Sequence, residues 1–308
     1  MRRSMLIHPD ELSKKWVDRL KEAGIQVIAL HPRGGSRTDE SLTALIEQLE
    51  DQEYRSLLDY AAQNGLEIEY EMHAAKYLLP RELFTEHPEY FRENMKGERV
   101  ADSNFCSSNE EALDRVAEGA AKLAKKLYRS SRNYYFWLDD CKKAKCYCDK
   151  CKELSASDQQ IFVMNRILKK LREEDPQARL AYLAYYDTLT PPEKVMPDEG
   201  IFVEYAPMQR DLTKPVCEMP SEEVENISRL ISLFGAENAR VLEYWYDNSF
   251  FSRYVKPPVK FVADNERIKE DLKFYEDMGF DEIATFACFL GRDYEELYGE
   301  FDISAFGL

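Results

Sequence analysis

Eight short runs of strand-forming residues alternate with amphipathic helical runs along this chain of 308 residues. Hydrophobic, β-branched and aromatic residues dominate the eight runs, which is typical of parallel strands whose sheet is covered by helices. The expected strands are residues 4–8, 25–31, 66–73, 133–138, 178–185, 200–205, 240–247 and 282–289. Eight strand–helix units favour closure of the sheet into a barrel.

Apolar residues at helical spacing fill most of the segments between these strands. The expected helices include residues 10–23, 40–63, 157–174, 221–234 and 268–278. Ser107 and Glu110 have the spacing of a capping box, which predicts a further helix from there to about residue 128.

A doubly wound open sheet is the rival arrangement, but it would place a Gly-x-Gly-x-x-Gly motif after the first strand, and none is present. The sequence also contains no internal repeat, low-complexity tract or clear linker. We therefore expect an α/β protein in which residues 1–308 form one domain, a single (β/α)8 TIM barrel.

Composition narrows the possible partners of the chain. Its formal net charge of -16 disfavours nucleic acid or an anionic membrane surface as the main partner. The apolar run at the N-terminus is too short for a signal peptide, and nowhere do about 18 apolar residues follow one another. We expect a cytoplasmic protein without a nucleic-acid or membrane partner; the sequence does not indicate its oligomeric state.

The candidate functional residues stand near the C-terminal ends of the expected strands, where barrels of this kind carry their active sites. The candidate catalytic acids are Asp139, Asp140, Glu204 and Glu243. The candidate substrate-binding residues combine polar with aromatic side chains and are His31, Arg33, His73, Trp137, Tyr185, Tyr205, Trp245 and Asp247. Carboxylates among aromatic faces suit a sugar, because its C–H faces stack on rings while acids bind its hydroxyl groups.

The adjacent acids Asp139 and Asp140 are the sharpest feature of this set. Two carboxylates at the end of an apolar strand repel each other, so the pKa of one should rise and leave a protonated acid beside an ionised one. Glycosidic cleavage can use such a pair, and a substrate-assisted reaction fits it well. The structural alternative is that the pair caps the next helix or binds loop amides. Glu204 and Glu243 could likewise form ordinary ion pairs.

A cysteine-rich loop follows this acid pair directly. Cys141, Cys146, Cys148 and Cys151 lie within eleven positions, and four thiolates could bind a structural zinc ion in a tetrahedral site. Free thiols and disulfides remain alternatives, and Cys106 could join the cluster in space. A catalytic cysteine is disfavoured, because no protease-like nucleophile motif surrounds these residues.

Several short motifs between residues 66 and 215 resemble a bacterial barrel family that was long filed as a domain of unknown function. The motifs are residues 87–91, 96–99, 105–109, 139–140, 146–151, 154–158, 163–165, 184–185 and 191–192. Characterised members of this family include endo-β-N-acetylglucosaminidases, and the family is distantly similar to α-glucuronidases and hexosaminidases. The resemblance implies a sugar-cleaving barrel with Asp139 and Asp140 near the reaction centre and His73 in the sugar pocket. Cys141 departs from the family pattern, which commonly has Gly there.

The leading hypothesis is therefore a glycoside hydrolase that acts on an oligosaccharide containing an N-acetylhexosaminide or a uronic acid. Asp140 would be the general acid, Asp139 would orient the substrate or stabilise positive charge, and no cofactor would be required for catalysis. Glu204 and Glu243 are reserve candidates for base or nucleophile. The alternatives are a non-catalytic carbohydrate-binding barrel and, ranked last, a metal-dependent hydrolase, because the strand-end histidines show no His-x-His signature.

Overall fold

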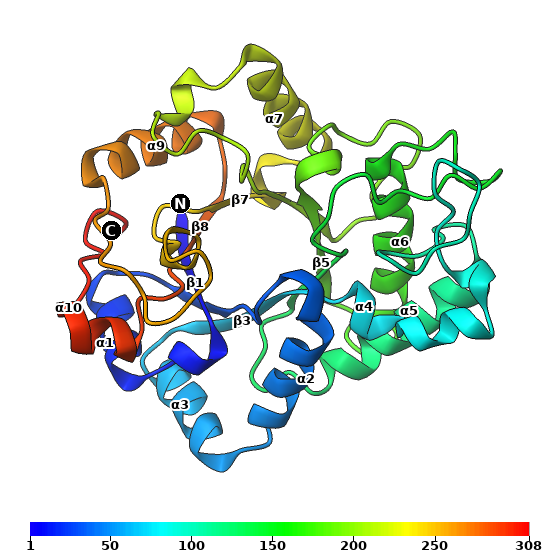
Figure 1. The fold of residues 1–308 in the computed structure, drawn as a ribbon. Coiled ribbons are helices and arrows are strands. Elements are labelled where there is room, and N and C mark those ends of the chain that lie inside the picture. The colour runs from blue at the N-terminus through cyan, green and yellow to red at the C-terminus, as the bar shows by residue number, and fades with distance from the viewer. Residues whose placement is uncertain (308) are drawn as a thin grey trace.

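The computed structural model describes residues 1–307 and shows eight parallel strands that form a closed barrel in sequence order (Figure 1). The strands are β1 (Arg2–Ile7), β2 (Val27–Leu30), β3 (Glu67–His73), β4 (Asn133–Trp137), β5 (Arg179–Ala184), β6 (Ile201–Tyr205), β7 (Ala239–Glu243) and β8 (Glu282–Phe286). Pairing of β1 with β8 closes the barrel, with Arg2 opposite Glu282 and Leu6 opposite Phe286. The predicted (β/α)8 TIM barrel is confirmed.

Helices surround the strands, as the view along the barrel in Figure 1 shows. They are α1 (Lys14–Glu22), α2 (Thr38–Gln48), α3 (Gln52–Gln63), α4 (Ala75–Leu78), α5 (Glu110–Ala124), α6 (Ala156–Leu171), α7 (Ser221–Phe234), α8 (Asn248–Phe251), α9 (Asn265–Met278) and α10 (Arg292–Tyr298). No helix within residues 1–307 combines the length and apolar character needed to cross a membrane.

The alternation of side chains along each strand creates two hydrophobic layers. Outward-facing residues pack against the helices in one large cluster, to which Ile28, Tyr70 and Val241 belong. Inward-facing residues fill the barrel in a second cluster, to which Ala29 and Phe202 belong. The barrel is therefore a packed core, and only its mouth is available for a ligand.

Three expected helix boundaries are corrected by local capping. The segment expected as one helix over residues 40–63 is two helices, because the Asp51 side chain accepts the Tyr54 N–H at 2.8 Å and starts α3. Similarly, Ser13 caps α1 after a short 3-10 turn, Pro9–Glu11. The helix expected from a capping box at Ser107 begins instead after Asn109, whose side chain accepts the Ala112 N–H.

Candidate functional site

A cavity of about 850 Å³ occupies the C-terminal mouth of the barrel. Each strand end or following loop from β1 to β8 contributes to its wall, as expected for a barrel of this kind. The aromatic and acidic residues in that wall are His8, His31, His73, Trp137, Asp140, Tyr185, Tyr186, Tyr244, Asp247, Tyr254, Phe286 and Phe289, with Glu40 at the edge of α2. Arg33 from the loop after β2 supplies a cation. The volume and the mixture of rings and acids suit a sugar ligand.

Asp139 and Asp140 are adjacent in the sequence but have different partners. The Asp139 carboxylate pairs with the Arg81 guanidinium and accepts the Asn104 backbone N–H at 2.5 Å. The Asn104 side chain in turn accepts the Asp139 N–H at 2.8 Å. Asp140 instead lines the large cavity, where Tyr185 donates its hydroxyl to the carboxylate at 2.9 Å. The pair therefore combines an anchored carboxylate with one that faces the cavity.

Two phenols surround the acid in the cavity. Burial is the main reason that the pKa of Tyr185 lies above its usual range, and the nearby charges of Tyr244 and Asp140 add to the effect. Burial, followed by the carboxylates of Asp247 and Asp140, also holds the pKa of Tyr244 well above its usual range. Both phenols thus stay protonated at neutral pH and can donate to Asp140 or to a ligand.

Asp247 is a second carboxylate in the cavity wall, on the loop that follows β7. It caps the short helix α8, since its Oδ1 accepts the Ser249 N–H at 3.1 Å and the Ser249 hydroxyl at 2.5 Å. Burial is the main cause that raises its pKa, and the bonds from Ser249 oppose the rise. The charges of Asp140 and Asp247 both raise the pKa of Tyr244, so both carboxylates lie near this phenol. One acid thus follows β4 and the other follows β7.

Three histidines form one wall of the cavity, and each binds a backbone carbonyl through Nδ1. The His8 Nδ1 lies 2.9 Å from the His31 carbonyl, and the His31 Nδ1 lies 2.8 Å from that of Glu71. The His73 Nδ1 lies 2.6 Å from the Leu138 carbonyl. Because a carbonyl only accepts, Nδ1 carries the proton and Nε2 is an acceptor in the neutral ring. Burial lowers the pKa of His8 to about 4 and that of His31 well below its usual value.

Glu204 lies inside the barrel but not in the cavity wall. Burial raises its pKa to about 8, against the opposing charge of Arg240, and the carboxylates of Glu69 and Glu282 also raise it. Burial and the charge of Glu204 hold the pKa of Glu71 well above its usual value. The expected placement of Glu204 at the reaction centre is therefore corrected: it belongs to a buried layer of charges below the cavity.

Three further candidates face outward from the barrel. Glu243 is fully buried against the Arg210 guanidinium at 2.9 Å and the Tyr275 hydroxyl at 2.6 Å. Trp245 donates its indole N–H at 2.9 Å to Asp271, a buried residue of α9. Tyr205 donates to Glu223 of α7 at 2.6 Å. Their expected placement in the site is corrected: the pleat of β6 and β7 turns Tyr205 and Glu243 toward the helices, and Trp245, after the end of β7, points toward α9.

The structure adds residues that the sequence analysis did not single out, above all Tyr244 and Phe286. Arg240 and Leu242 of β7, and Tyr244 directly after the strand, face the barrel interior in alternation, whereas Glu243 faces outward. The period of two was visible in the sequence, and assigning a face to each residue of the strand would have found Tyr244. Of the predicted binding residues, the cavity wall contains His31, Arg33, His73, Trp137, Tyr185 and Asp247.

The cysteine cluster forms at one side of the barrel, with Cys106 in the place predicted for Cys141. The thiols of Cys106, Cys146, Cys148 and Cys151 lie within 4.8 Å of one another. Cys141 lies outside this group, and its thiol is 3.5 Å from the Asp139 carbonyl. Within residues 1–307, these four are the one group of three or more His, Cys, Asp or Glu side chains near enough to share a metal ion. The strand-end histidines therefore provide no metal site of this kind.

Comparison with known proteins identifies the family of this chain. Residues 41–293 match the sequence profile of a family described as "Domain of unknown function (DUF4838)". The match covers most of the chain, so the chain belongs to this family. A search among curated proteins produced no match.

Solved structures with a similar fold include glycoside hydrolases of low sequence identity. A β-galactosidase from the psychrophilic Marinomonas ef1 is 12% identical with a TM-score of 0.54, and the alignment covers 92% of this chain and 54% of that one. A Bacteroides ovatus GH5 xyloglucanase is 14% identical with a TM-score of 0.52, and the alignment covers 96% of this chain and 66% of that one. The GH20 catalytic modules of a pneumococcal exo-β-D-N-acetylglucosaminidase are 13% identical with a TM-score of 0.52, and the alignment covers 99% of this chain and 82% of that one.

At this level of identity, the likeness shows a shared fold. The chain spans about half the length of the β-galactosidase and just under two thirds of the xyloglucanase. Fold and family together define a (β/α)8 barrel of the DUF4838 family.

Proposed function

We propose that this protein is a glycoside hydrolase and that Asp140 is its general acid. The observation that carries the proposal is the position of Asp140 in the wall of a cavity of about 850 Å³ that aromatic side chains also line. The Tyr185 hydroxyl, at 2.9 Å, fixes the orientation of the carboxyl group. A general acid must reach the glycosidic oxygen, and of the four candidate acids Asp140 is the one in the cavity wall.

The other groups of the cavity would divide the remaining roles. Asp139 is a positioning residue, since Arg81 and Asn104 hold its carboxylate and thereby the backbone that leads to Asp140. Asp247 is the second carboxylate that could stabilise positive charge on the sugar ring in the transition state. Tyr186, which is partly exposed, and Tyr254, which is largely exposed, lie in the cavity wall and offer faces for stacking.

The substrate class follows from the polar groups of the cavity. We propose an oligosaccharide that contains an N-acetylhexosaminide or a uronic acid. Arg33 would bind the carboxylate of a uronic acid, and the phenols would donate to the carbonyl of an acetamido group. The chemistry needs no cofactor, because proton transfer and charge stabilisation come from side chains.

A non-catalytic carbohydrate-binding barrel is the second candidate, favoured by one observation. Glu204 and Glu243 lie outside the cavity wall, and Asp139 is already paired. Apart from the exposed Glu40, Asp140 and Asp247 are then the carboxylates of the cavity wall that could take part in catalysis. If Asp247 serves only to cap α8, the cavity would bind sugar without cleaving it.

The test is a screen of the purified protein against aryl glycosides and N-glycan fragments, with binding measured in parallel by calorimetry. The variants are Asp140→Asn and, as a matched control, Asp277→Asn, which removes an exposed carboxylate from α9. We expect turnover by the wild type and by Asp277→Asn, and a loss of at least about 100-fold in Asp140→Asn. Full turnover by Asp140→Asn would contradict the role of this residue. Binding without turnover by the wild type would favour the binding barrel, and neither binding nor turnover would overturn both proposals.

A further inference from the structure

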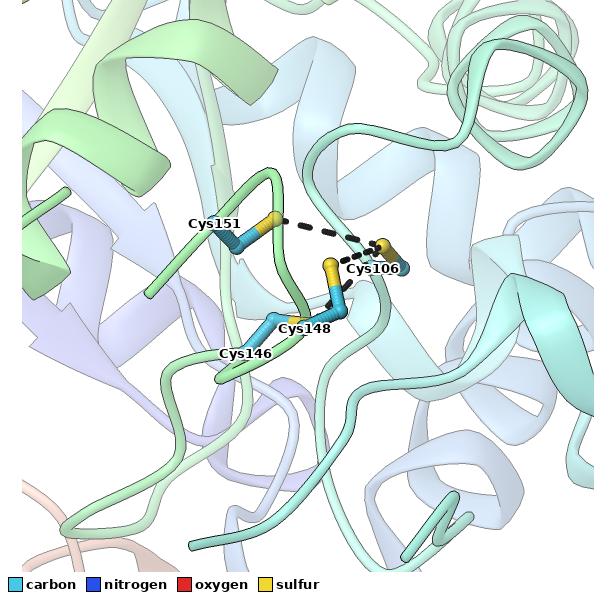
Figure 2. A group of neighbouring side chains, drawn as sticks. All are labelled: Cys106, Cys146, Cys148 and Cys151. Atoms are coloured by element: carbon cyan, nitrogen blue, oxygen red, sulfur yellow. Dashed lines mark hydrogen bonds between the residues drawn. The ribbon is translucent and has the colours of Figure 1, made fainter. Parts of the chain in front are cut away.

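Four buried thiols from two distant segments of the chain meet beside the barrel (Figure 2). Cys106 comes from the segment that leads into α5, and the other three come from the loop between β4 and α6. The Cys106 Sγ lies 3.7 Å from that of Cys146, 3.7 Å from that of Cys148 and 4.0 Å from that of Cys151. The four sulfur atoms thus form a compact group, and the dashed lines in Figure 2 converge on the sulfur of Cys106.

These spacings match the geometry of a tetrahedral metal site. Four thiolates at about 2.3 Å from a zinc ion lie about 3.8 Å from one another. Two sulfur atoms joined in a disulfide are only about 2 Å apart. We propose that Cys106, Cys146, Cys148 and Cys151 bind one structural zinc ion. Four thiolate ligands leave no open coordination position, so the ion would stabilise the fold and would not take part in the reaction.

Polar groups around the cluster are aimed at the sulfur atoms. The Glu93 N–H donates to the Cys146 Sγ at 3.3 Å, and the Ser107 hydroxyl lies 3.3 Å from the Cys151 Sγ. The Ser108 hydroxyl lies 3.4 Å from the Cys106 Sγ. Donors of this kind orient thiolate ligands and tune their charge. Four reduced thiols that merely fill a hydrophobic core would not need them.

A cation also stands at the cluster. The Arg99 guanidinium lies 4.0 Å from the Cys146 Sγ and donates to the Phe91 carbonyl at 2.7 Å. A zinc ion with four thiolates carries a net charge of −2, which is costly to bury without a nearby cation. Arg99 offsets part of that charge, so the surroundings fit a charged metal–thiolate centre better than neutral thiols.

The backbone that carries the ligands is fixed from α6. Gln159 is buried; its side-chain carbonyl accepts the Cys146 N–H at 2.8 Å, and its amide donates to the carbonyls of Cys146 and Cys151 at 2.9 and 3.0 Å. The Cys151 N–H also donates to the Cys148 carbonyl at 2.9 Å, which closes the tight turn of the Cys-x2-Cys pair. The loop therefore presents its three thiols in one direction.

The proposed zinc site is joined to the cavity through two residues. Cys106 follows Asn104 by two positions, and Asn104 holds both the backbone and the carboxylate of Asp139. Loss of the ion would free Cys106 from its three partners and loosen this contact. The zinc site is thus expected to steady the loop that carries Asp140. This consequence rests on the proposed function, whereas the metal site itself does not.

The test compares metal content among cysteine variants of the full chain. Wild type, Cys106→Ser and Cys148→Ser are purified after growth with zinc and analysed by mass spectrometry for metals. Cys141→Ser is the matched control, because this thiol belongs to the same loop but lies outside the cluster. We expect about one zinc ion per chain in the wild type and in Cys141→Ser, and at least a tenfold loss in the other two variants.

A second measurement covers variants that fail to fold. Thiol modification of the native wild type and of Cys141→Ser with a mercurial, monitored with a zinc-binding dye, should release about one equivalent of zinc. A wild type without zinc, an iron ion in its place, or loss of zinc in Cys141→Ser with retention in Cys106→Ser would overturn the proposal. These readouts do not involve sugars, so their failure and the failure of the glycosidase proposal are distinguishable.

Discussion

The lower interior of the barrel and the cavity at its mouth contain the same types of residue in different states. In the lower interior, Arg240 lies 3.5 Å from both Glu69 and Glu282. Tyr135 donates to Glu69 at 2.6 Å, and Asn133 donates to the same carboxylate at 2.8 Å. The charges of Glu69, Glu282 and Arg240 are thus buried and paired with one another, so they need no ligand to compensate them.

At the mouth, acids and phenols face open space. Asp140 is exposed to the cavity and has one phenol as its partner, and the three histidines turn their Nδ1 atoms to the backbone. Both regions show carboxylates near aromatic rings in the sequence. The difference teaches that a polar residue in a barrel strand indicates a site only where its partners leave room for a ligand.

The largest loss of stability is expected when Arg240, in the lower interior of the barrel, is replaced. Arg240→Leu removes the cation between Glu69 and Glu282 and leaves these buried carboxylates under-compensated, at a cost of about 3–5 kcal/mol in the free energy of unfolding. Urea denaturation measures the change. Arg229→Leu is the control, because its ion pair with Glu193 is exposed and its loss should cost no more than about 0.5 kcal/mol. Equal losses in both variants would show that the lower interior does not depend on this pairing.

The next effect is a pH dependence that arises below the cavity. The raised pKa of Glu204, about 8, lies above the value of a solvated Glu, 4.5, so the protonated form stabilises the folded state. That contribution is complete below pH 4.5 and is lost as the pH rises through about 8. Glu204→Gln keeps the neutral form throughout, so we expect its stability relative to wild type to increase over this range by up to about 1.4 kcal/mol per pH unit.

This experiment needs the comparison with wild type, because His8 and His31 change the free energy of unfolding with pH in the direction opposite to Glu204. Their pKa values are lowered, so they reduce stability as the pH falls below about 6.5, in both proteins alike. Glu193→Gln, at an exposed position, is the control and should follow the wild type. Parallel stability curves for Glu204→Gln and wild type would contradict the raised pKa.

The smallest losses of stability are expected when a single tyrosine hydroxyl is removed, once in the lower interior and once at the mouth. Tyr135→Phe removes a donor to the buried Glu69 carboxylate and should cost about 1.5–3 kcal/mol, because bonds to buried charges are the strong ones. Tyr185→Phe removes the donor to Asp140, which water can replace in the open cavity, and should cost about 1 kcal/mol or less. Thermal unfolding measures both. The reverse order would mean that the mouth, and not the lower interior, carries the stability of the barrel.

The fold followed from local patterns. The period of two in the strands and of 3.6 in the helices arises from backbone geometry within a few residues, so the number and order of the strands were readable in the sequence. Local capping was harder to place, as Asp51 shows, because a carboxylate inside a helical pattern can either continue the helix or start a new one. The position of Asp139 and Asp140 at the end of β4 was predicted in the same local way.

The partners of those residues depended on tertiary structure. Arg81, 58 positions from Asp139, decides that this carboxylate is anchored while Asp140 faces the cavity. Cys106, 40 positions from Cys146, takes the place in the cluster that proximity in the sequence had given to Cys141. Closure of the barrel fixes which face of β7 lies inside, and so brings Tyr244 into the cavity and turns Glu243 toward α9. Sequence alone determines the number and order of the strands, because these result from short-range geometry. Contacts between distant segments exist only once the barrel has closed.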